Sequence, residues 1–286
     1  MREGDGVPRE GKAALLQALE HPRYEVIPLR RAAERLQVLE PGTTVTITCS
    51  PRGGIEATVE LARHAQRQGL RAVPHIAARQ VRDKSHLADI LAQLAEEGIE
   101  EIFVPGGDQT PPVGDFHAAA DLLEAMAGMP HSIQRVGITG YPEGHPLIDD
   151  ERLNEALVAK APHAHYIVTQ MCFEPEAVTR WIRSVRERSI TLPVYLGVPT
   201  IADRLHLLRI ATQIGVGPSV RYLRHQGEFA RRVLLPGAPG PDRAVLDFAS
   251  AVADPELGIA GFHLYTFNQV DEARRWIASL RERLQQ

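Results

Sequence analysis

The chain has 286 residues, a mass of 31.5 kDa, 44% hydrophobic residues and a formal net charge of −4. This size and composition allow one sizeable core, and the mildly acidic balance offers no basic surface for nucleic acid. No stretch approaches the roughly 20 apolar residues of a membrane helix, the polar N-terminus lacks a signal peptide's apolar run, and two cysteines exclude a secreted disulfide scaffold. We therefore expect a cytoplasmic protein that binds neither nucleic acid nor membranes.

Eight short segments, mostly β-branched or continuously apolar, are predicted to be strands buried on both faces. In chain order they are residues 24–27, 45–49, 72–77, 102–108, 136–141, 166–172, 194–198 and 261–267. Amphipathic runs between and after them predict helices at residues 55–68, 85–97, 116–127, 174–188 and 271–284. Gly69, Gly98 and Gly215 follow helical runs and are predicted to end them.

Strands that alternate with helices indicate βαβ units and a parallel sheet. Eight such units in 286 residues favour an α/β fold of the (β/α)8, TIM-barrel type, which typically takes about 250 residues. A doubly wound dinucleotide-binding sheet is disfavoured because no G-x-G-x-x-G follows a strand. We expect one catalytic barrel domain over residues 1–286, with residues 1–20 as an N-terminal helical extension and the Pro/Gly-rich residues 235–241 as an exposed loop.

Polar residues gather at the predicted C-terminal strand ends, where barrels of this type carry their active sites. They are Glu25, Thr48, His75, Asp108, Tyr141, Gln170 and Tyr265. Each one taken alone could be a hydrogen-bonded polar group that caps the barrel, but their convergence on one face favours a site.

Glu25 is the sharpest candidate because it lies inside an apolar strand beside Val26 and Ile27. Desolvation there would raise the pKa of its carboxyl group and let it carry a proton near neutral pH. The alternative is an ordinary ion pair with Arg23 or Arg30 at the barrel mouth.

Two loops add further candidates. The sequence Gly106-Gly107-Asp108 would let the backbone approach a flat ligand with a carboxylate facing it, although it is also a good turn. Residues 141–146, Tyr-Pro-Glu-Gly-His-Pro, form a loop stiffened by two prolines that suits ligand positioning, although a rigid surface turn is the alternative.

Taken together, these segments resemble the methylenetetrahydrofolate reductase family, and the likeness runs from about residue 24 to the end of the chain. The matching pieces are Pro-His-Ile at 74–76, Gly-Asp at 107–108, Gly-Tyr-Pro-Glu-Gly-His-Pro at 140–146, Ile-Val-Thr-Gln at 167–170 and Phe-His-Leu-Tyr-Thr-Phe-Asn at 262–268. They occur in the family's order, each at the end of the expected strand.

The resemblance implies reduction of 5,10-methylenetetrahydrofolate to 5-methyltetrahydrofolate in one-carbon metabolism and methionine biosynthesis, with NADH or NADPH as donor and FAD as the relay. It implies that Glu25 is the general acid and that Asp108 stabilises the cationic intermediate. Gln170, Asp108 and Tyr265 would bind the folate, and a homo-oligomer is also implied. The flavin contacts would be Thr48, His75, Gly107, Asp108, Tyr141 and His145.

Three departures from the family pattern bear on the cofactor. Gly106 stands where the family usually has arginine, and Ala159-Lys160 stands where it tends to have an Arg-Lys pair, so two cations for the FAD pyrophosphate are lost. Arg52, Arg79 or Lys160 could replace them. Residues 200–203, Thr-Ile-Ala-Asp, lack the aromatic often found there. FAD is favoured, and direct hydride transfer from NAD(P)H is the main variant.

Three other functional classes are alternatives to a reductase. A metal-dependent hydrolase would use His163 and His165, but they precede the sixth strand, away from the other candidates, so we expect no metal site. No lysine falls within a strand, which disfavours a Schiff-base aldolase. A catalytically silent folate-binding relative would have no use for a buried Glu25. Cys49 and Cys172 are expected to pack as small apolar side chains.

Overall fold

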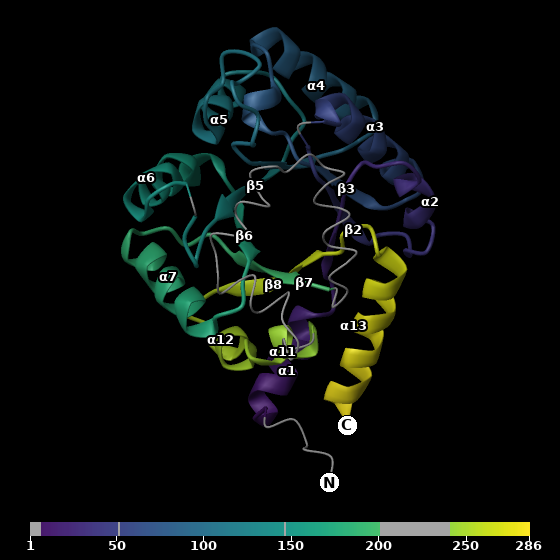
Figure 1. Cartoon of the computed structure of the whole chain (residues 1–286), viewed down its shortest axis with the longest axis vertical. Coiled ribbons are helices and arrows are strands. Elements are labelled where there is room, and N and C mark those ends of the chain that lie inside the picture. Colours follow the sequence, from purple (N-terminus) through teal and green to yellow (C-terminus); the bar gives the residue numbers. More distant parts are fainter. Residues whose placement is uncertain (1–6, 51, 146, 201–240) are drawn as a thin grey trace.

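A computed structural model describes residues 7–50, 52–145, 147–200 and 241–286. Eight parallel strands form a ring with helices around it (Figure 1). The strands are β1 (Arg23–Val26), β2 (Thr44–Ile47), β3 (Arg71–Pro74), β4 (Glu101–Val104), β5 (Arg135–Gly140), β6 (Tyr166–Met171), β7 (Val194–Pro199) and β8 (Ile259–Tyr265). The sequence prediction of an α/β, (β/α)8 TIM-type barrel is confirmed.

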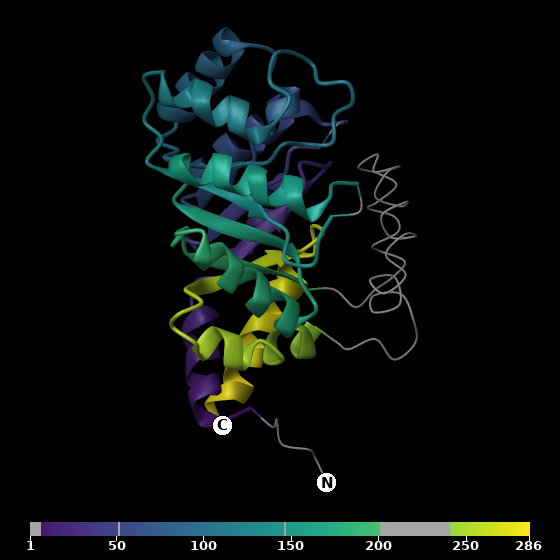
Figure 2. The ribbon, with the colours of Figure 1, turned by 90° about the vertical axis from the view of Figure 1, so that its left-hand side faces the viewer.

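Helices follow most of the strands and cover the outside of the ring. They are α1 (Arg9–Ala18), α2 (Ala32–Leu36), α3 (Gly54–Arg67), α4 (Lys84–Glu96), α5 (Ala119–Ala127), α6 (Asp150–Lys160), α7 (Pro175–Glu187), α11 (Pro241–Leu246), α12 (Ala249–Ala253) and α13 (Val270–Gln285), with 3₁₀ turns η1 (Ala78–Gln80) and η2 (Ala161–His163). Helix α1 packs against α12 and α13, at one end of the molecule in Figure 2.

The sheet runs in the order β3-β2-β1-β8-β7-β6-β5-β4, so closure depends on its two edge strands, β3 and β4. A parallel bridge between His75 and Phe103 joins them. Just beyond it, the Ile76 amide donates to the Phe103 carbonyl at 2.8 Å and the Ala78 amide to the Pro105 carbonyl at 3.0 Å. These bonds close the barrel and bring all eight C-terminal strand ends to one rim.

Local sequence signals account for the helix ends. The Asp83 and Asp149 side chains accept hydrogen bonds from the His86 and Arg152 amides and cap α4 and α6. Gly69 (φ 81°) and Gly98 (φ 66°) follow α3 and α4 in the left-handed conformation, as predicted for helix stops. Gly215 and residues 235–240 lie outside the described residues.

Two apolar clusters hold the barrel together. The larger one fills the space between the sheet and the helices, as expected for strands that are apolar on their outer face. The smaller cluster lies inside the ring and consists of Val73, Phe103, Tyr166 and Val168, with Tyr195 packed against it. Gly137 gives the Tyr166 ring its place, because a Cβ at that position would overlap the ring.

Several strands end earlier than the sequence predicted. β2, β3, β4 and β8 stop at Ile47, Pro74, Val104 and Tyr265, whereas the apolar runs continue to residues 49, 77, 108 and 267. The extra residues are loop residues at the C-terminal rim, and Phe267 and Asn268 have positive φ angles of 48° and 63°. The polar candidates therefore lie partly on loops.

Candidate active site

The predicted site residues follow the strands in a regular way. Glu25, Gln170 and Tyr265 lie within β1, β6 and β8; Thr48, His75 and Tyr141 follow β2, β3 and β5 directly; and Gly107 and Asp108 lie in the loop after β4. Because all the strands are parallel, these eight residues share the C-terminal rim. His145 lies in the loop after β5, and Lys160 is the last residue of α6.

Glu25 faces the barrel interior, where 14% of its side chain is exposed. Burial raises the pKa of its carboxyl group to about 7, although the neighbouring His75 acts in the opposite direction. Its carboxylate Oε2 lies 3.0 Å from Nε2 of His263 on β8. Arg23 does not pair with Glu25, because its guanidinium bonds to Glu101 at 2.7 Å and to the Tyr166 hydroxyl at 2.8 Å. A proton on Glu25 near neutral pH fits general-acid chemistry.

The end of β8 holds the end of β1 in place. Thr266 donates its hydroxyl to the Glu25 carbonyl at 2.5 Å. The Asn268 amide group accepts from the Ile27 amide at 2.7 Å and donates to the Ile27 carbonyl at 2.9 Å. We call these three bonds the β8–β1 clasp. It fixes the backbone on both sides of Val26 and so the direction in which Glu25 points.

Four buried polar atoms around Glu25 have no hydrogen-bond partner among the described residues. They are Thr46 Oγ1, Thr48 Oγ1, His75 Nε2 and His263 Nδ1. Burial lowers the pKa of His75 to about 4 and that of His263 to about 3, so both rings are neutral at pH 7. Buried polar groups are seldom left unpaired, so this arrangement is typical of a site whose partners arrive with a ligand.

The loop after β4 is held from η1. Arg79 donates Nε–H to the Gln109 carbonyl at 2.7 Å, and its backbone carbonyl accepts from the Val113 amide at 2.9 Å. Gly107 has φ 89°, a conformation that favours glycine. The Arg79 side chain thus holds the loop that carries Asp108. Burial, with a smaller contribution from the Asp108 charge, raises the pKa of Tyr141, whereas burial lowers the pKa of His145 against the opposing effect of Asp108.

Glu143 ties the loop after β5 to strand β6. Its Oε1 accepts hydrogen bonds from the amides of Phe173 at 2.6 Å and Glu174 at 2.8 Å, the two residues directly before α7, and so holds the turn from β6 into α7. Gln170 donates its side-chain amide to the Gly144 carbonyl at 2.9 Å. The loop carrying Tyr141 and His145 and the predicted folate residue Gln170 are therefore one connected unit.

Lys160 is buried, and its Nζ lies 2.9 Å from Thr139 Oγ1 and 3.1 Å from the Thr139 carbonyl. Burial lowers the pKa of this amine to about 8. No salt bridge joins it to a carboxylate within the described residues. A buried amine without a carboxylate partner fits a site that accepts an anion.

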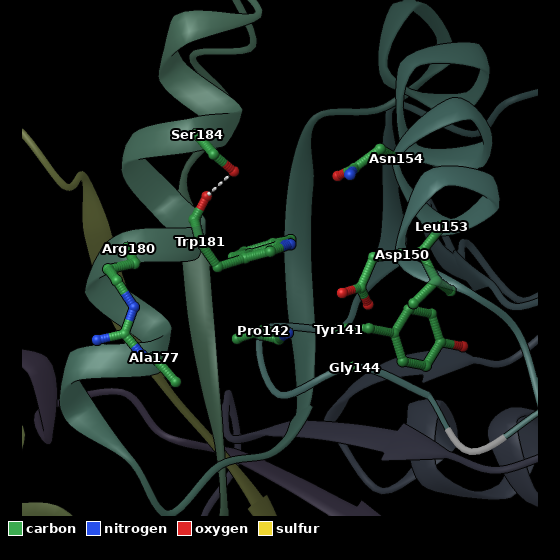
Figure 3. A pocket seen from close by; sticks show the side chains of 10 residues that line it. All are labelled: Tyr141, Pro142, Gly144, Asp150, Leu153, Asn154, Ala177, Arg180, Trp181 and Ser184. Atoms are coloured by element: carbon green, nitrogen blue, oxygen red, sulfur yellow. Dashed lines mark hydrogen bonds between the residues drawn. The ribbon is translucent and has the colours of Figure 1, made fainter.

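A cavity of about 290 Å³ lies between α6 and α7 (Figure 3). Asp150, Leu153 and Asn154 line it from α6, and Trp181 reaches it from α7. Tyr141 and Pro142 form its side next to the β5 loop. The Trp181 ring gives the cavity a flat face, and Asp150 and Asn154 give it polar groups. This combination suits a heterocyclic ligand.

The histidines and cysteines of the described residues form neither a metal-binding group nor a reactive thiol. No group of three or more His, Cys, Asp or Glu side chains suited to a metal occurs in the described part of the chain. The His165 ring accepts a hydrogen bond from the Val136 amide near the start of β5, at the opposite rim from Glu25. Burial raises the pKa of Cys49 to about 11 and that of Cys172 further, so both remain thiols at neutral pH.

Comparison with known proteins agrees with this geometry. The family model described as methylenetetrahydrofolate reductase matches residues 22–218. The chain belongs to the methylenetetrahydrofolate reductase family. Methylenetetrahydrofolate reductase 2 of Schizosaccharomyces pombe is 30% identical over 74% of this chain and 36% of its own length. The Caenorhabditis elegans protein named "Probable methylenetetrahydrofolate reductase (NADPH)" is 26% identical over 66% of this chain and 29% of its own length. The chain thus matches about a third of these relatives.

Several residues that support the site through hydrogen bonds were not predicted as site residues. His263, Thr266 and Asn268 were recognised only as parts of a motif, and Glu143 only as a loop residue. The signal that could have found them is the polar character of β8 and the β5 loop in otherwise apolar surroundings. Of the departures noted above, Thr200 is described and buried, and residues 201–203 lie outside the described part.

Among the described helices, none is long and apolar enough to cross a membrane.

Proposed function

We propose that this chain reduces 5,10-methylenetetrahydrofolate to 5-methyltetrahydrofolate, taking a hydride from NAD(P)H and a proton from Glu25. The observation that carries the proposal is Glu25 itself, a carboxyl group with a pKa of about 7 at the rim of a reductase-family barrel. General-acid catalysis is most efficient when the pKa of the acid lies near the working pH.

In this proposal, the Glu25 proton goes to the folate nitrogen that leaves the methylene carbon, and the bond between them breaks. The remaining iminium carbon is electrophilic and accepts the hydride, which gives the methyl group. Asp108 would stabilise the positive charge of the iminium. Gln170 and Tyr265 would orient the folate, and their side chains are held by bonds to the Gly144 and Thr169 carbonyls at 2.9 and 3.1 Å.

The residues present fit FAD as a cofactor. Thr48 Oγ1 and His75 Nε2, which have no partner in the described part of the chain, offer hydrogen bonds to a polar ring system, and Gly107 leaves its backbone open to close approach. Lys160 is the cation available for phosphate, and the cavity beside Tyr141 suits an adenine ring. Tyr141 and His145 would complete the contacts. The chemistry that FAD supplies when bound is the relay of a hydride from NAD(P)H to the folate.

Direct hydride transfer from NAD(P)H on the same barrel is the second candidate, and one observation favours it. Gly106 stands where the family has arginine, and the space beside its Cα is open, because a Cβ there would meet no atom within 4 Å. Arg79 is bound to the β4 loop and does not replace it. The visible absorption spectrum of the purified chain, before and after addition of FAD, separates the two routes. A shifted flavin band supports the relay, and a colourless protein that ignores FAD supports direct transfer.

The reaction is tested by incubating the purified chain with methylenetetrahydrofolate and NADH or NADPH and measuring 5-methyltetrahydrofolate. Glu25→Gln should lower the turnover number by about 10²- to 10⁴-fold and leave folate binding intact. A chain that binds folate but forms no product, with or without FAD, would contradict the proposal and favour a silent folate-binding relative.

We also propose that residues 1–286 act as one barrel domain, with residues 1–20 as its extension, and that the chain assembles as a homo-oligomer. Light scattering tests the assembly.

A further inference from the structure

Strand β6 has a bulge close to its C-terminal end. Its register against β7 moves by one residue between Val168 and Met171. Thr169 and Gln170 therefore lie opposite a single residue of β7. A bulge takes backbone groups out of the regular ladder and turns a side chain in a new direction, and bulges are frequent next to active sites. The folate candidate Gln170 is one of the two bulged residues.

Three side chains supply hydrogen bonds to this bulge. Thr169 Oγ1 accepts from the Gly197 amide at 2.8 Å. The Thr169 carbonyl accepts from the Tyr265 hydroxyl at 3.1 Å. The Cys172 thiol lies 3.0 Å from the Gln170 carbonyl and 3.2 Å from Thr169 Oγ1, and it donates its hydrogen to one of them. Because Thr169 and Cys172 are fully buried, water cannot take the place of these bonds.

Gly197 makes this arrangement possible. A Cβ at position 197 would lie 2.5 Å from the Thr169 carbonyl oxygen, 2.7 Å from the Gln170 carbonyl oxygen and 2.7 Å from Cε2 of the Tyr265 ring. Strand β7 lies between β6 and β8 in the sheet. The missing side chain therefore lets the Tyr265 ring on β8 cross β7 and reach the bulge on β6, which is a typical use of glycine within a strand.

The bulge controls the direction of the Gln170 side chain. The Thr169 carbonyl belongs to the peptide group that joins Thr169 to Gln170, so a rotation of this peptide would turn the Cα–Cβ bond of Gln170. At its other end, the Gln170 side chain donates to the Gly144 carbonyl at 2.9 Å. The side chain is thus held by the β5 loop at its tip and by the bulge at its base.

We propose that Thr169 and Tyr265 are positioning residues that hold the β6 bulge and, through it, keep the Gln170 side chain in the direction that binds the folate. The Tyr265 hydroxyl then acts on folate affinity through β6 and Gln170. The inference deepens the proposed function and rests on it, because Gln170 orients the folate there.

Folate affinity in matched variants tests the inference. Each chain is titrated with 5-methyltetrahydrofolate, and steady-state rates are measured with methylenetetrahydrofolate. Tyr265→Phe keeps the ring and removes the hydroxyl, and Thr169→Val keeps the shape and removes the acceptor of the Gly197 amide. Each should weaken folate affinity by about tenfold and raise KM, with little change in kcat. Thr169→Ser keeps the hydroxyl and should retain parent affinity, as should the control Tyr195→Phe, which changes a tyrosine of the smaller apolar cluster.

Gln170→Ala separates positioning from direct contact. In a Gln170→Ala chain, adding Tyr265→Phe or Thr169→Val should weaken folate affinity no further, because the side chain that the bulge directs is absent. A further tenfold loss in that background would overturn the inference. So would a loss with Tyr265→Phe but not with Thr169→Val, because the hydroxyl would then contact the folate itself.

Hydrogen exchange of the unliganded chains tests the bulge without folate. The Gly197 amide should exchange at least about tenfold faster in Thr169→Val and Tyr265→Phe than in the parent and in Thr169→Ser. Equal exchange in all four chains, or parent-like folate affinity in both variants of an active chain, would overturn the inference and leave the proposed function standing. A parent chain that neither binds nor reduces folate would overturn the proposed function and this inference with it.

Discussion

The two ends of the barrel interior differ in how their polar groups are paired. At the N-terminal end, the Arg23 guanidinium bonds to Glu101 and Tyr166 and lies over the rings of Tyr166 and Tyr195, with 4.6 and 4.9 Å between its Cζ and the ring centroids. Nearer the C-terminal end, Thr46, Thr48 and His75 each keep a buried polar atom without a partner in the described structure; Arg23 Nε, and His263 Nδ1 opposite it on β8, are the corresponding atoms lower in the barrel. The first half is organised for stability, and the second holds polar atoms ready for a ligand.

Arg23 gives the largest expected effect on stability. Arg23→Leu should lower the free energy of unfolding by about 3 kcal/mol, because it leaves the buried Tyr166 hydroxyl without its donor and Glu101 with the longer 4.0 Å contact to Arg135. Chemical denaturation measures the change. In the double variant Arg23→Leu/Glu101→Gln the second substitution should cost less than it does alone. Additive costs would mean that the pair does not stabilise the N-terminal half.

Glu25 should lower stability at neutral pH, in contrast to Arg23. In the folded chain its proton is held up to pH about 7, whereas the unfolded chain releases it above the ordinary value of 4.5. The stability this group contributes below pH 4.5 is therefore lost as the pH rises to about 7, a change of about 3 kcal/mol. Glu25→Gln should be more stable than the parent at pH 8 by about that amount, and equal to it at pH 4. Denaturation curves at both values check this, and a pH-independent difference would contradict it.

Turnover should show the same titration. If protonated Glu25 is the acid, kcat/KM should fall about tenfold for each pH unit above about 7. Steady-state rates between pH 6 and pH 9 measure this limb. A flat profile across that range would mean that the C-terminal half does not use Glu25 as its proton source.

Glu143 gives the smallest expected effect. Glu143→Ala removes the acceptor of the Phe173 and Glu174 amides and should lower the unfolding free energy by about 1–3 kcal/mol. It should also weaken folate binding, because the loop that Gln170 contacts is released. Glu143→Gln keeps an acceptor oxygen and is the matched control. Thermal melting and a folate titration measure the two effects. Loss of stability with unchanged folate affinity would mean that Glu143 stabilises the chain but does not shape the folate site.

Much of the fold could be predicted because its signals are local. The β-branched strands, Gly69 and Gly98 each act within a few residues. The rim position of Glu25 followed from the strand pattern, and so did the desolvation that raises its pKa. Helix α6 was not among the predicted helices, because among its apolar residues only Leu157 is buried and its amphipathic pattern is weak.

The supporting partners could not be predicted in the same way. His263, Thr266 and Asn268 reach Glu25 and Ile27 across 238 and 241 residues of sequence. The local sequence pattern does not show which side chains meet where the last strand, β8, pairs with the first, β1. Likewise, Glu143 accepts the Glu174 amide 31 residues later, before α7 begins, and no local pattern reports that contact.

The β8–β1 clasp also sets a time at which the site can form. The residues that hold Glu25 and Ile27 follow them by 241 positions, so a ribosome working at about 5–20 residues per second needs about 12–50 s to supply them. Until then β1 lacks its β8 neighbour and the carboxyl group has no fixed direction. Chains that stop between Tyr265 and Asn268 would carry every strand-end candidate without a seated Glu25, so proton donation would begin only after Asn268 has been added.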